Sequence, residues 1–192
     1  MKHFYHWCLT IATALLSITS CVQKSTANNK ANEQTMNNDK VLVAYFSATG
    51  TTKRVAQRIA KATNGELLAI EPEMPYSSAD LDWTVSSSRS SRENADASSR
   101  PAFKHTKNNL NNYTIIYLGF PIWWDVCPRV VNTFIEAYHL DGKKVMPFAT
   151  SGGTTIDHSV KELKLLYPNI HWLTGALLNS PSDKAIEAFI AQ

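Results

Sequence analysis

Several features that mark common protein classes are scarce or missing in this sequence of 192 residues. Only three residues are cysteine, and there is no internal repeat, no heptad pattern and no run of basic residues. The formal net charge of +3 is too small to indicate a nucleic-acid partner. Serine never occurs in the G-x-S-x-G pattern of many hydrolases. We also predict no metal, because four histidines lack the spacing of metal ligands: His105, His139, His158 and His171.

The first 20 residues resemble a bacterial lipoprotein signal. MKHFYHW carries a positive charge, CLTIATALLSI is apolar but short for a bilayer span, and Ile-Thr-Ser precedes Cys21. We expect residues 1–20 to be removed and Cys21 to be lipidated, which would anchor the chain to a membrane of the cell envelope, facing the periplasm or the exterior. The alternative is an uncleaved amino-terminal anchor. Residues 21–39 are polar and without periodicity, which predicts a flexible tether.

Lipidation of Cys21 would leave a single free thiol in the mature chain. Cys8 would be lost with the signal, so Cys127 would have no partner for an intramolecular disulfide. A lone thiol is typical of inert packing, and a redox-active thiol near a bound ring is the alternative.

From Lys40 onward, apolar runs alternate with segments of helical spacing. The runs predict strands at residues 41–46, 66–72, 113–120, 143–150 and 169–178. Helices are predicted at residues 51–62 and 129–138, around Val160, Leu163 and Leu166, and at residues 183–191. Continuous apolar runs indicate strands that are buried on both faces. The alternation therefore predicts an α/β fold in residues 40–192, with a five-stranded parallel sheet covered by helices.

The loop after the first predicted strand is suited to an anion. A helix that begins directly after this loop offers unpaired backbone N–H groups and the positive end of its dipole to a phosphate. Gly50 lets the backbone approach the phosphate oxygens closely. The loop contains no lysine, so it is not a Walker-type nucleotide loop, and the alternative is a simple capped helix start. The candidate phosphate-binding residues are Ser47, Ala48, Thr49, Gly50, Thr51 and Thr52.

Two further loops would lie at the same edge of a parallel sheet, where ligands of such folds bind. The loop after the third predicted strand offers Pro121, Ile122, Trp123 and Trp124. Two adjacent indoles there favour a cover for a flat ligand, although both could simply pack at the rim of the sheet. The loop after the fourth strand adds Thr150, Ser151, Gly152 and Gly153.

These three loops in this order resemble those of the flavodoxin family. The SATGTT stretch matches the phosphate loop of the family. Small bacterial flavodoxin-like proteins carry stretches similar to Gly-Phe-Pro-Ile-Trp-Trp, Thr-Ser-Gly-Gly, SSRSSRE and SSRP of this sequence. The resemblance implies a three-layer sandwich with strand order 2-1-3-4-5. It also implies FMN, with its phosphate on the first loop and its ring between the other two. Backbone amides, rather than cations, would hold the phosphate, and the Gly152-Gly153 peptide would reorient toward the flavin N5 region.

We expect the two indoles to have different roles. Trp124 should lie nearer the flavin ring, because Pro121 and Ile122 begin the loop and the second indole is farther from the strand. Trp123 should chiefly stabilise the fold.

Residues 76–112 form a longer connection than a minimal fold requires. Connections above about 12–15 residues are usually functional or have structure of their own. Leu81 and Val85 predict a helix within residues 80–94. The connection also contains Arg89, Arg92 and Arg100. These arginines either face a substrate or redox partner, or form a solvated surface in which Arg100 makes a local ion pair.

Two classes of function remain. One is an FMN-binding redox protein, either an electron carrier or a small reductase of quinone-like or other acceptors, with unknown electron donor and acceptor. The other is a non-catalytic binding or interaction lipoprotein of the same fold. Loss of residues 1–20 would leave a net charge of +2, unlike the strongly acidic balance typical of carrier flavodoxins, which argues against a simple shuttle. We therefore favour an oxidoreductase.

Overall fold

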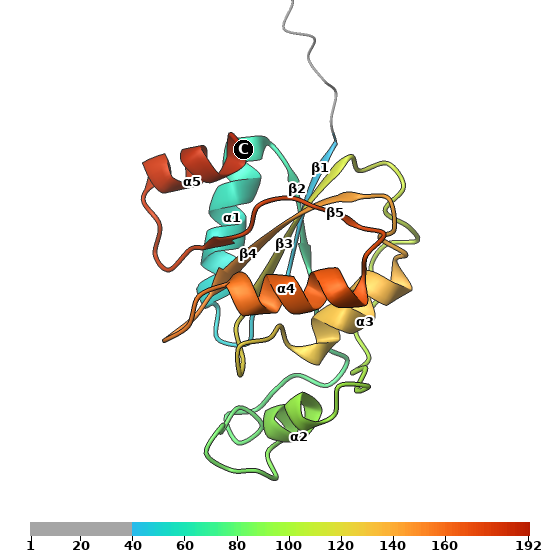
Figure 1. Cartoon of the computed structure of the whole chain (residues 1–192), viewed down its shortest axis with the longest axis vertical. Helices are drawn as coiled ribbons and strands as arrows, with labels where there is room; N and C mark the ends of the chain where they lie inside the picture. The colour runs from blue at the N-terminus through green and yellow to red at the C-terminus, as the bar shows by residue number, and fades with distance from the viewer. Residues whose placement is uncertain (1–39) are drawn as a thin grey trace, which may run out of the picture. The chain divides into compact units, whose positions relative to one another are not determined.

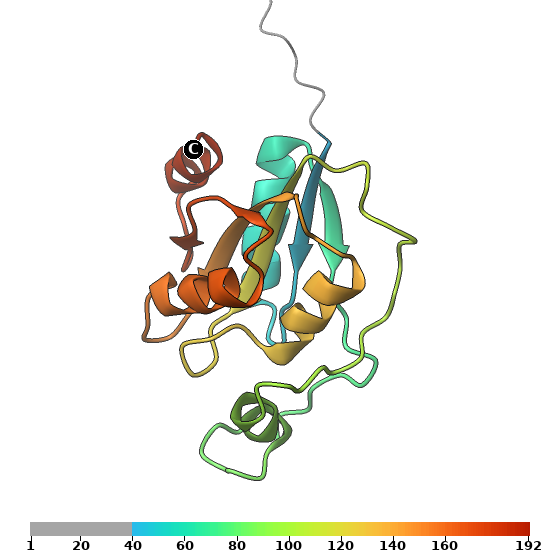
Figure 2. The same cartoon turned by 45° about the vertical axis from the view of Figure 1, so that its right-hand side comes forward.

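The computed structural model describes residues 40–192, which form a parallel sheet with helices on both faces (Figures 1 and 2). The predicted signal, Cys21 and the tether lie outside the described residues. The strands are β1 (Val41–Tyr45), β2 (Glu66–Ala69), β3 (Ile115–Pro121), β4 (Lys144–Thr150), β5 (His171–Trp172) and β6 (Ala176–Leu177). The helices are α1 (Thr51–Thr63), α2 (Arg89–Ala95), α3 (Arg129–Ala137), α4 (Asp157–Leu166) and α5 (Asp183–Ile190). None of the helices in residues 40–192 has the length and apolar character needed to cross a membrane.

Neighbouring strands follow the order β2-β1-β3-β4-β5, and every pairing is parallel. The predicted α/β fold and its strand order are confirmed. β1 lies between β2 and β3, so the strands that follow it in sequence are added to the sheet first on one side of β1 and then on the other. A ligand crevice is expected outside the carboxyl ends of the strands at such a reversal.

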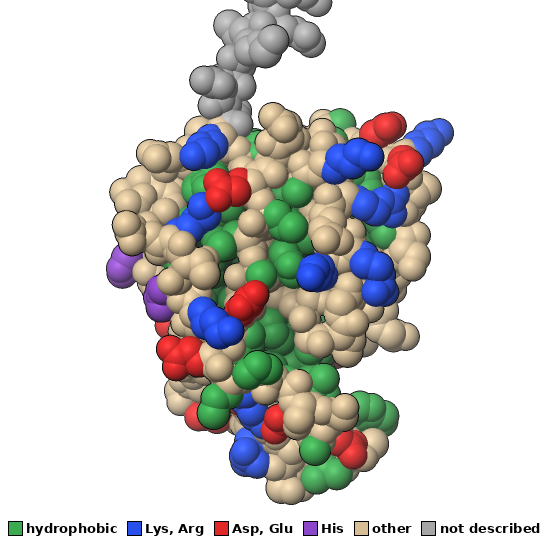
Figure 3. Space-filling model, turned by 180° about the vertical axis from the view of Figure 1, so that it is seen from behind, with side chains coloured by type: hydrophobic (Ala, Val, Ile, Leu, Met, Phe, Trp, Pro, Cys, Tyr) green, Lys and Arg blue, Asp and Glu red, His purple; other side chains and the backbone are tan. Residues whose placement is uncertain are grey.

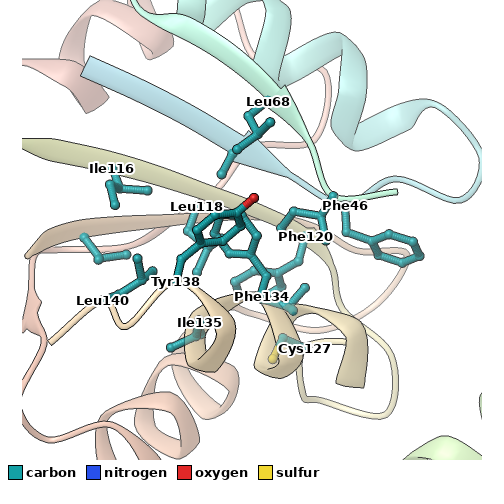
Figure 4. Close-up of a cluster of buried hydrophobic side chains, with 14 of the residues drawn as sticks. Phe46, Leu68, Ile116, Leu118, Phe120, Cys127, Phe134, Ile135, Tyr138 and Leu140 are labelled. Carbon is teal, nitrogen blue, oxygen red and sulfur yellow. The ribbon is translucent and has the colours of Figure 1, made fainter. Parts of the chain in front are cut away.

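Alternate residues of β1 enter two separate cores, which explains the continuous apolar run. Leu42 belongs to the core that contains Phe134 of α3, shown in Figure 4. Val43 belongs to the core formed with Ile59 of α1 and Phe189 of α5. Successive side chains of a strand point to opposite faces, so a strand covered on both faces has no polar side. The two helical layers therefore hold β1 and β3 in the centre of the molecule.

Gly119 allows a close contact between β3 and β4. It is paired with Phe148 in the sheet, and a Cβ atom at position 119 would lie 2.2 Å from the Phe148 ring. The ring of Phe148 therefore covers the backbone of β3 directly beneath the loop that carries the two indoles.

The fifth predicted strand, residues 169–178, is wrong as a single element. It consists of β5 and β6, which pair with different parts of β4. The interruption lies opposite Pro147, whose nitrogen has no hydrogen to donate. A Cβ atom at Gly175 would lie 3.0 Å from the Pro147 ring, so the chain bends around this proline.

The connection between β2 and β3 extends beyond the sheet at the carboxyl ends of the strands (Figures 1 and 2). The helix predicted for residues 80–94 is only partly correct, because α2 begins at Arg89. Ser88 is extended and its hydroxyl accepts a bond from the Ser91 amide, which starts the helix there. Before it, the Asp80 and Asp82 side chains bond to nearby backbone amides and hold turns instead.

Candidate functional site

The carboxyl ends of β1, β3 and β4 border a cleft of about 360 Å³. A volume of this size is sufficient for a small organic ligand. The cleft brings together nine of the fourteen residues predicted from the three loops: Ser47, Ala48, Thr49, Thr52, Pro121, Ile122, Trp123, Trp124 and Thr150. The other five lie on the same loops but do not line it: Gly50, Thr51, Ser151, Gly152 and Gly153.

The loop before α1 leaves the amino terminus of this helix open. Gly50 is the N-cap residue with a φ of 88°, and no side chain among residues 40–192 caps the helix. The Gly50 amide donates to the Ser47 hydroxyl at 3.1 Å, and Arg54 is the first amide of α1 that bonds back to the Gly50 carbonyl, at 3.2 Å. The amides of Thr51, Thr52 and Lys53 therefore have no acceptor among residues 40–192, as is usual in the first turn of a helix. The left-handed Gly50 and the absent cap argue against a simple capped helix start.

Hydroxyl groups connect this loop to β4. The side chains of Thr52 and Thr150 are both buried, and their hydroxyl oxygens are 2.9 Å apart. The bond holds the first turn of α1 against the end of β4, so it connects the loop before α1 with the loop after β4.

A cation also lies beside the loop, although the loop itself contains none. Arg54 donates to the Thr51 hydroxyl at 3.3 Å, and a Cβ atom on Gly50 would lie 3.7 Å from its guanidinium. Arg54 is not among the predicted site residues, and its position one turn into α1 is the signal that could have identified it. It adds positive charge outside the cleft, next to the free amides.

The two indoles occupy a tight hairpin. Trp123 and Val126 exchange backbone hydrogen bonds of 3.0 and 3.1 Å, and the residues between them, Trp124 and Asp125, have φ values of 48° and 65°. Two consecutive left-handed residues are typical of a type I′ turn, in which asparagine and glycine are preferred. A tryptophan there is strained. The turn therefore holds the Trp124 indole at the apex of the loop, where it is 40% exposed.

Contacts from α4 hold the strained hairpin in place. The buried Ser159 donates to the Asp125 carbonyl at 2.6 Å, and His158 Nδ1 lies 3.3 Å from the same oxygen. In contrast to Trp124, the Trp123 ring is packed inward, edge-on to Phe46 with ring centroids 5.5 Å apart. Trp123 thus packs against Phe46 while it also lines the cleft, and Trp124 lies at the exposed end of the hairpin.

The glycine pair after β4 lies outside the cleft lining. The side-chain amide of Asn179 bonds both backbone groups of Ser151, at 2.9 and 2.6 Å. The Ser151 hydroxyl accepts from the Gly153 amide at 3.2 Å. A Cβ atom added at Gly152 or Gly153 would meet nothing within 4 Å. The loop is therefore anchored at Ser151, and no neighbouring group packs where a side chain would stand on either glycine.

Three residues of the long connection also line the cleft: Leu81, Trp83 and Ser90. None of the three is among the predicted site residues, although the length of the connection and its SSRSSRE stretch indicate a segment with a function or structure of its own. All twelve lining residues are uncharged. The aromatic and apolar part of this lining suits a neutral, flat ring.

The other candidates have structural roles. Cys127 is buried, and burial raises the pKa of its thiol to about 12, so it is not a reactive thiolate. Arg100 makes an ion pair with Glu136 at 2.8 Å, as one of the two interpretations predicted. Arg89 pairs with Glu93 at 2.6 Å, and Arg92 bonds the Ser87 carbonyl. Within residues 40–192, no three metal-ligating side chains cluster.

Comparison with known proteins agrees with this architecture. A family model described as flavodoxin matches residues 40–192. A candidate flavoprotein from Bacteroides eggerthii is 52% identical, with a TM-score of 0.78 over 80% of this chain and 97% of that one. One from Bacteroides uniformis is 49% identical, with a TM-score of 0.77 over 80% and 99% of the two chains.

A more distant structure shares the fold. It is a flavoprotein of Lactobacillus acidophilus in complex with FMN, 23% identical with a TM-score of 0.61, covering 77% of this chain and 98% of that one. No curated protein matched. The family match extends over the whole described domain and the two Bacteroides proteins share about half of its residues, so the chain belongs to the flavodoxin family.

Proposed function

We propose that this chain is an FMN-binding redox protein that passes electrons to quinone-like or other small acceptors at the cell envelope. The observation that carries the proposal is the open, uncapped amino terminus of α1 at one end of an uncharged aromatic cleft. FMN combines a dianionic phosphate with a flat, apolar ring, and the site offers a matching part for each.

The phosphate would lie on the loop before α1. The free amides of the first turn and the helix dipole attract an anion there. The backbone at Gly50 can approach the phosphate oxygens because position 50 has no side chain. Arg54, beside the loop, would reinforce the attraction without entering the cleft.

The ring would lie against the exposed Trp124 indole. The hairpin fixes the backbone that carries this indole, and a tryptophan side chain has only two rotatable bonds, so little entropy is lost when a flat ring stacks on it. The peptide of Gly152 and Gly153 borders the same end of the sheet and would reorient toward the ring.

When bound, FMN supplies one- and two-electron redox chemistry. None of the twelve described residues that line the cleft could act as an acid or base near neutral pH. The residues of the chain would therefore bind and orient the ring and exclude water, while protons would come from solvent. An uncharged lining also disfavours a charged reduced ring, because an ion in a poorly solvated site is costly.

Support for FMN comes from membership of the flavodoxin family and from the Lactobacillus acidophilus relative, which is described in complex with FMN. We also propose lipidation at Cys21 on the basis of the Ile-Thr-Ser-Cys sequence. Mass spectrometry of the mature amino terminus tests this second point, and an unmodified chain that begins at Met1 would exclude it.

The decisive experiment titrates FMN and riboflavin against apo-protein prepared from the purified full chain. Riboflavin has the same ring but no phosphate. FMN should bind at least tenfold more tightly, because only FMN contacts the amides before Arg54. Equal affinities would mean that the loop is only a helix start, and a protein that binds neither flavin would leave the non-catalytic binding lipoprotein as the better interpretation.

A further inference from the structure

The segment of residues 76–95 is fixed against the cleft rather than loosely attached. The Tyr76 ring is edge-on to Trp123, with centroids 5.3 Å apart, and the Arg89 guanidinium lies 4.1 Å above the Tyr76 ring. The Tyr76 hydroxyl and Arg89 both bond to Glu93. These contacts join the start of the segment to α2 and to the hairpin of the two indoles.

The far end of the segment is held from α3. Arg129 is only 5% exposed and donates to the Glu93 and Asn94 carbonyls at 3.4 and 3.3 Å. A buried arginine that bonds the last carbonyls of a helix fixes the position of that helix end. The segment is therefore a wall of the cleft, which places its side chains reproducibly.

The deepest residue of this wall has an unused hydrogen-bonding group. Ser90 is 2% exposed, and its hydroxyl has no partner among residues 40–192. Its amide bonds the Asp80 carbonyl at 3.0 Å, so its backbone is fixed. A buried hydroxyl without a partner costs about 1–3 kcal/mol. Such a group is retained where a ligand or a water supplies the missing bond.

Ser90 borders two spaces. One is the main cleft, and the other is a cavity of about 10 Å³ behind Trp123, at the lower limit for one water molecule. A serine hydroxyl can turn among three rotamers, so the oxygen can reach a partner in either space.

The rest of the wall is apolar and aromatic. Leu81 and Trp83 line the same cleft as Ser90 and Trp124, and the Trp83 indole is 73% exposed. Figure 3 shows hydrophobic side chains gathered on the lobe that this connection forms. Two exposed indoles and a leucine favour a planar conjugated ring, and the absence of charge in the lining favours a neutral one.

We propose that Leu81, Trp83 and Ser90 form a ring-binding subsite for a planar, uncharged, conjugated carbonyl compound, with the Ser90 hydroxyl donating to a ring carbonyl oxygen. This inference rests on the proposed function. Two molecules have this chemistry: the flavin, whose ring carries carbonyl groups, and a quinone acceptor bound beside it. The subsite deepens the proposed function because it gives the long connection a role in recognising a ring. The phosphate loop cannot recognise a ring.

The test compares two variants of the full chain, Ser90→Ala and Trp83→Ala. Ser86→Ala is the matched control, because Ser86 is exposed in the same segment and does not line the cleft. Three affinities are measured for each protein: FMN and riboflavin with apo-protein, and 2-methyl-1,4-naphthoquinone with oxidised FMN-loaded protein, followed by the flavin absorbance so that no turnover is needed. Thermal unfolding of each apo-protein is measured in parallel.

Both variants should weaken the same ligand, Ser90→Ala by about 3- to 10-fold, the range expected for one hydrogen bond. If the ring is the flavin's, FMN and riboflavin weaken by the same factor, because they share it. If the ring is the acceptor's, only the naphthoquinone weakens. The apo-protein with Ser90→Ala should be at least as stable as wild type, because it loses an unsatisfied hydroxyl.

Any other pattern overturns the inference. Unchanged affinities with a lower unfolding temperature for Ser90→Ala would show that a water in the small cavity already satisfies the hydroxyl. These outcomes are distinct from failure of the proposed function, which would appear in the wild-type protein as equal affinity for FMN and riboflavin.

Discussion

Replacing Trp124 with glycine should weaken FMN while leaving the stability of the apo-protein nearly unchanged. Trp124 is 40% exposed at a φ of 48°. Loss of a large side chain that stacks on the flavin should reduce affinity by about 1–3 kcal/mol, or roughly 5- to 150-fold. In the apo-protein, the lost packing is offset by relief of left-handed strain, which costs about 1–3 kcal/mol for a non-glycine residue. The net change in unfolding free energy should therefore be within about 1 kcal/mol.

The neighbouring positions provide matched controls. Asp125→Gly relieves the same kind of strain at a φ of 65° without removing an indole, so it should stabilise the protein by about 1 kcal/mol and leave FMN affinity unchanged. Trp123→Ala removes edge-on contacts with Phe46 and Tyr76 at 5.5 and 5.3 Å. It should lower the unfolding free energy by about 2–4 kcal/mol.

The assays are urea unfolding of each apo-protein and fluorescence titration with FMN at a temperature where every variant is folded. Flavin fluorescence in the complex should be less quenched without the Trp124 indole. If Trp123→Ala loses FMN while Trp124→Gly keeps both its affinity and the quenching, the assignment of the two indoles is reversed. If neither variant affects the flavin, the hairpin does not bind the ring.

Two further predictions concern how the domain is held together. Arg129→Met should destabilise the protein by about 2 kcal/mol, because it removes the bonds to the Glu93 and Asn94 carbonyls and the ion pair with Glu162. Limited proteolysis should then cut in residues 76–95, and an unchanged cleavage pattern would contradict the role of Arg129 in holding this segment. The Arg100 guanidinium lowers the pKa of Glu136 below its ordinary 4.5, so this pair stabilises the fold above that pH and less as pH falls through the lowered pKa. Glu136→Gln should therefore lose less stability than wild type between pH 6 and pH 3. Equal changes of the urea midpoint with pH in the two proteins would contradict this.

Much of the fold follows from local sequence pattern. The run from Val41 to Phe46 is apolar throughout because its side chains alternate between two cores, and Asn64 adopts the left-handed conformation that ends α1. The split between β5 and β6 was not predictable from apolar content, because it depends on pairing with Pro147 of a different strand.

The site was predictable only where it is built from strand ends. Thr49 and Trp124 follow buried strands, so the rule for parallel sheets places both at one edge. Ser90 lies in a polar stretch within a long connection, and its place in the cleft depends on Arg129, which is 39 positions later and bonds to residues near it. Which of two adjacent indoles faces inward likewise depends on the hairpin's backbone conformation rather than on residue type.

The wall formed by residues 76–95 has a consequence for how this domain can change. Apart from Tyr76, which packs against the larger core, the segment contributes no side chain to either core. Substitutions in it should therefore alter which molecules reach the cleft without weakening the sheet. The parallel sheet and the phosphate loop would stay the same, while the segment that covers the cleft could be replaced. Exchanging residues 77–88 between members of the family would be a direct way to change ligand preference while the rest of the domain stays as it is.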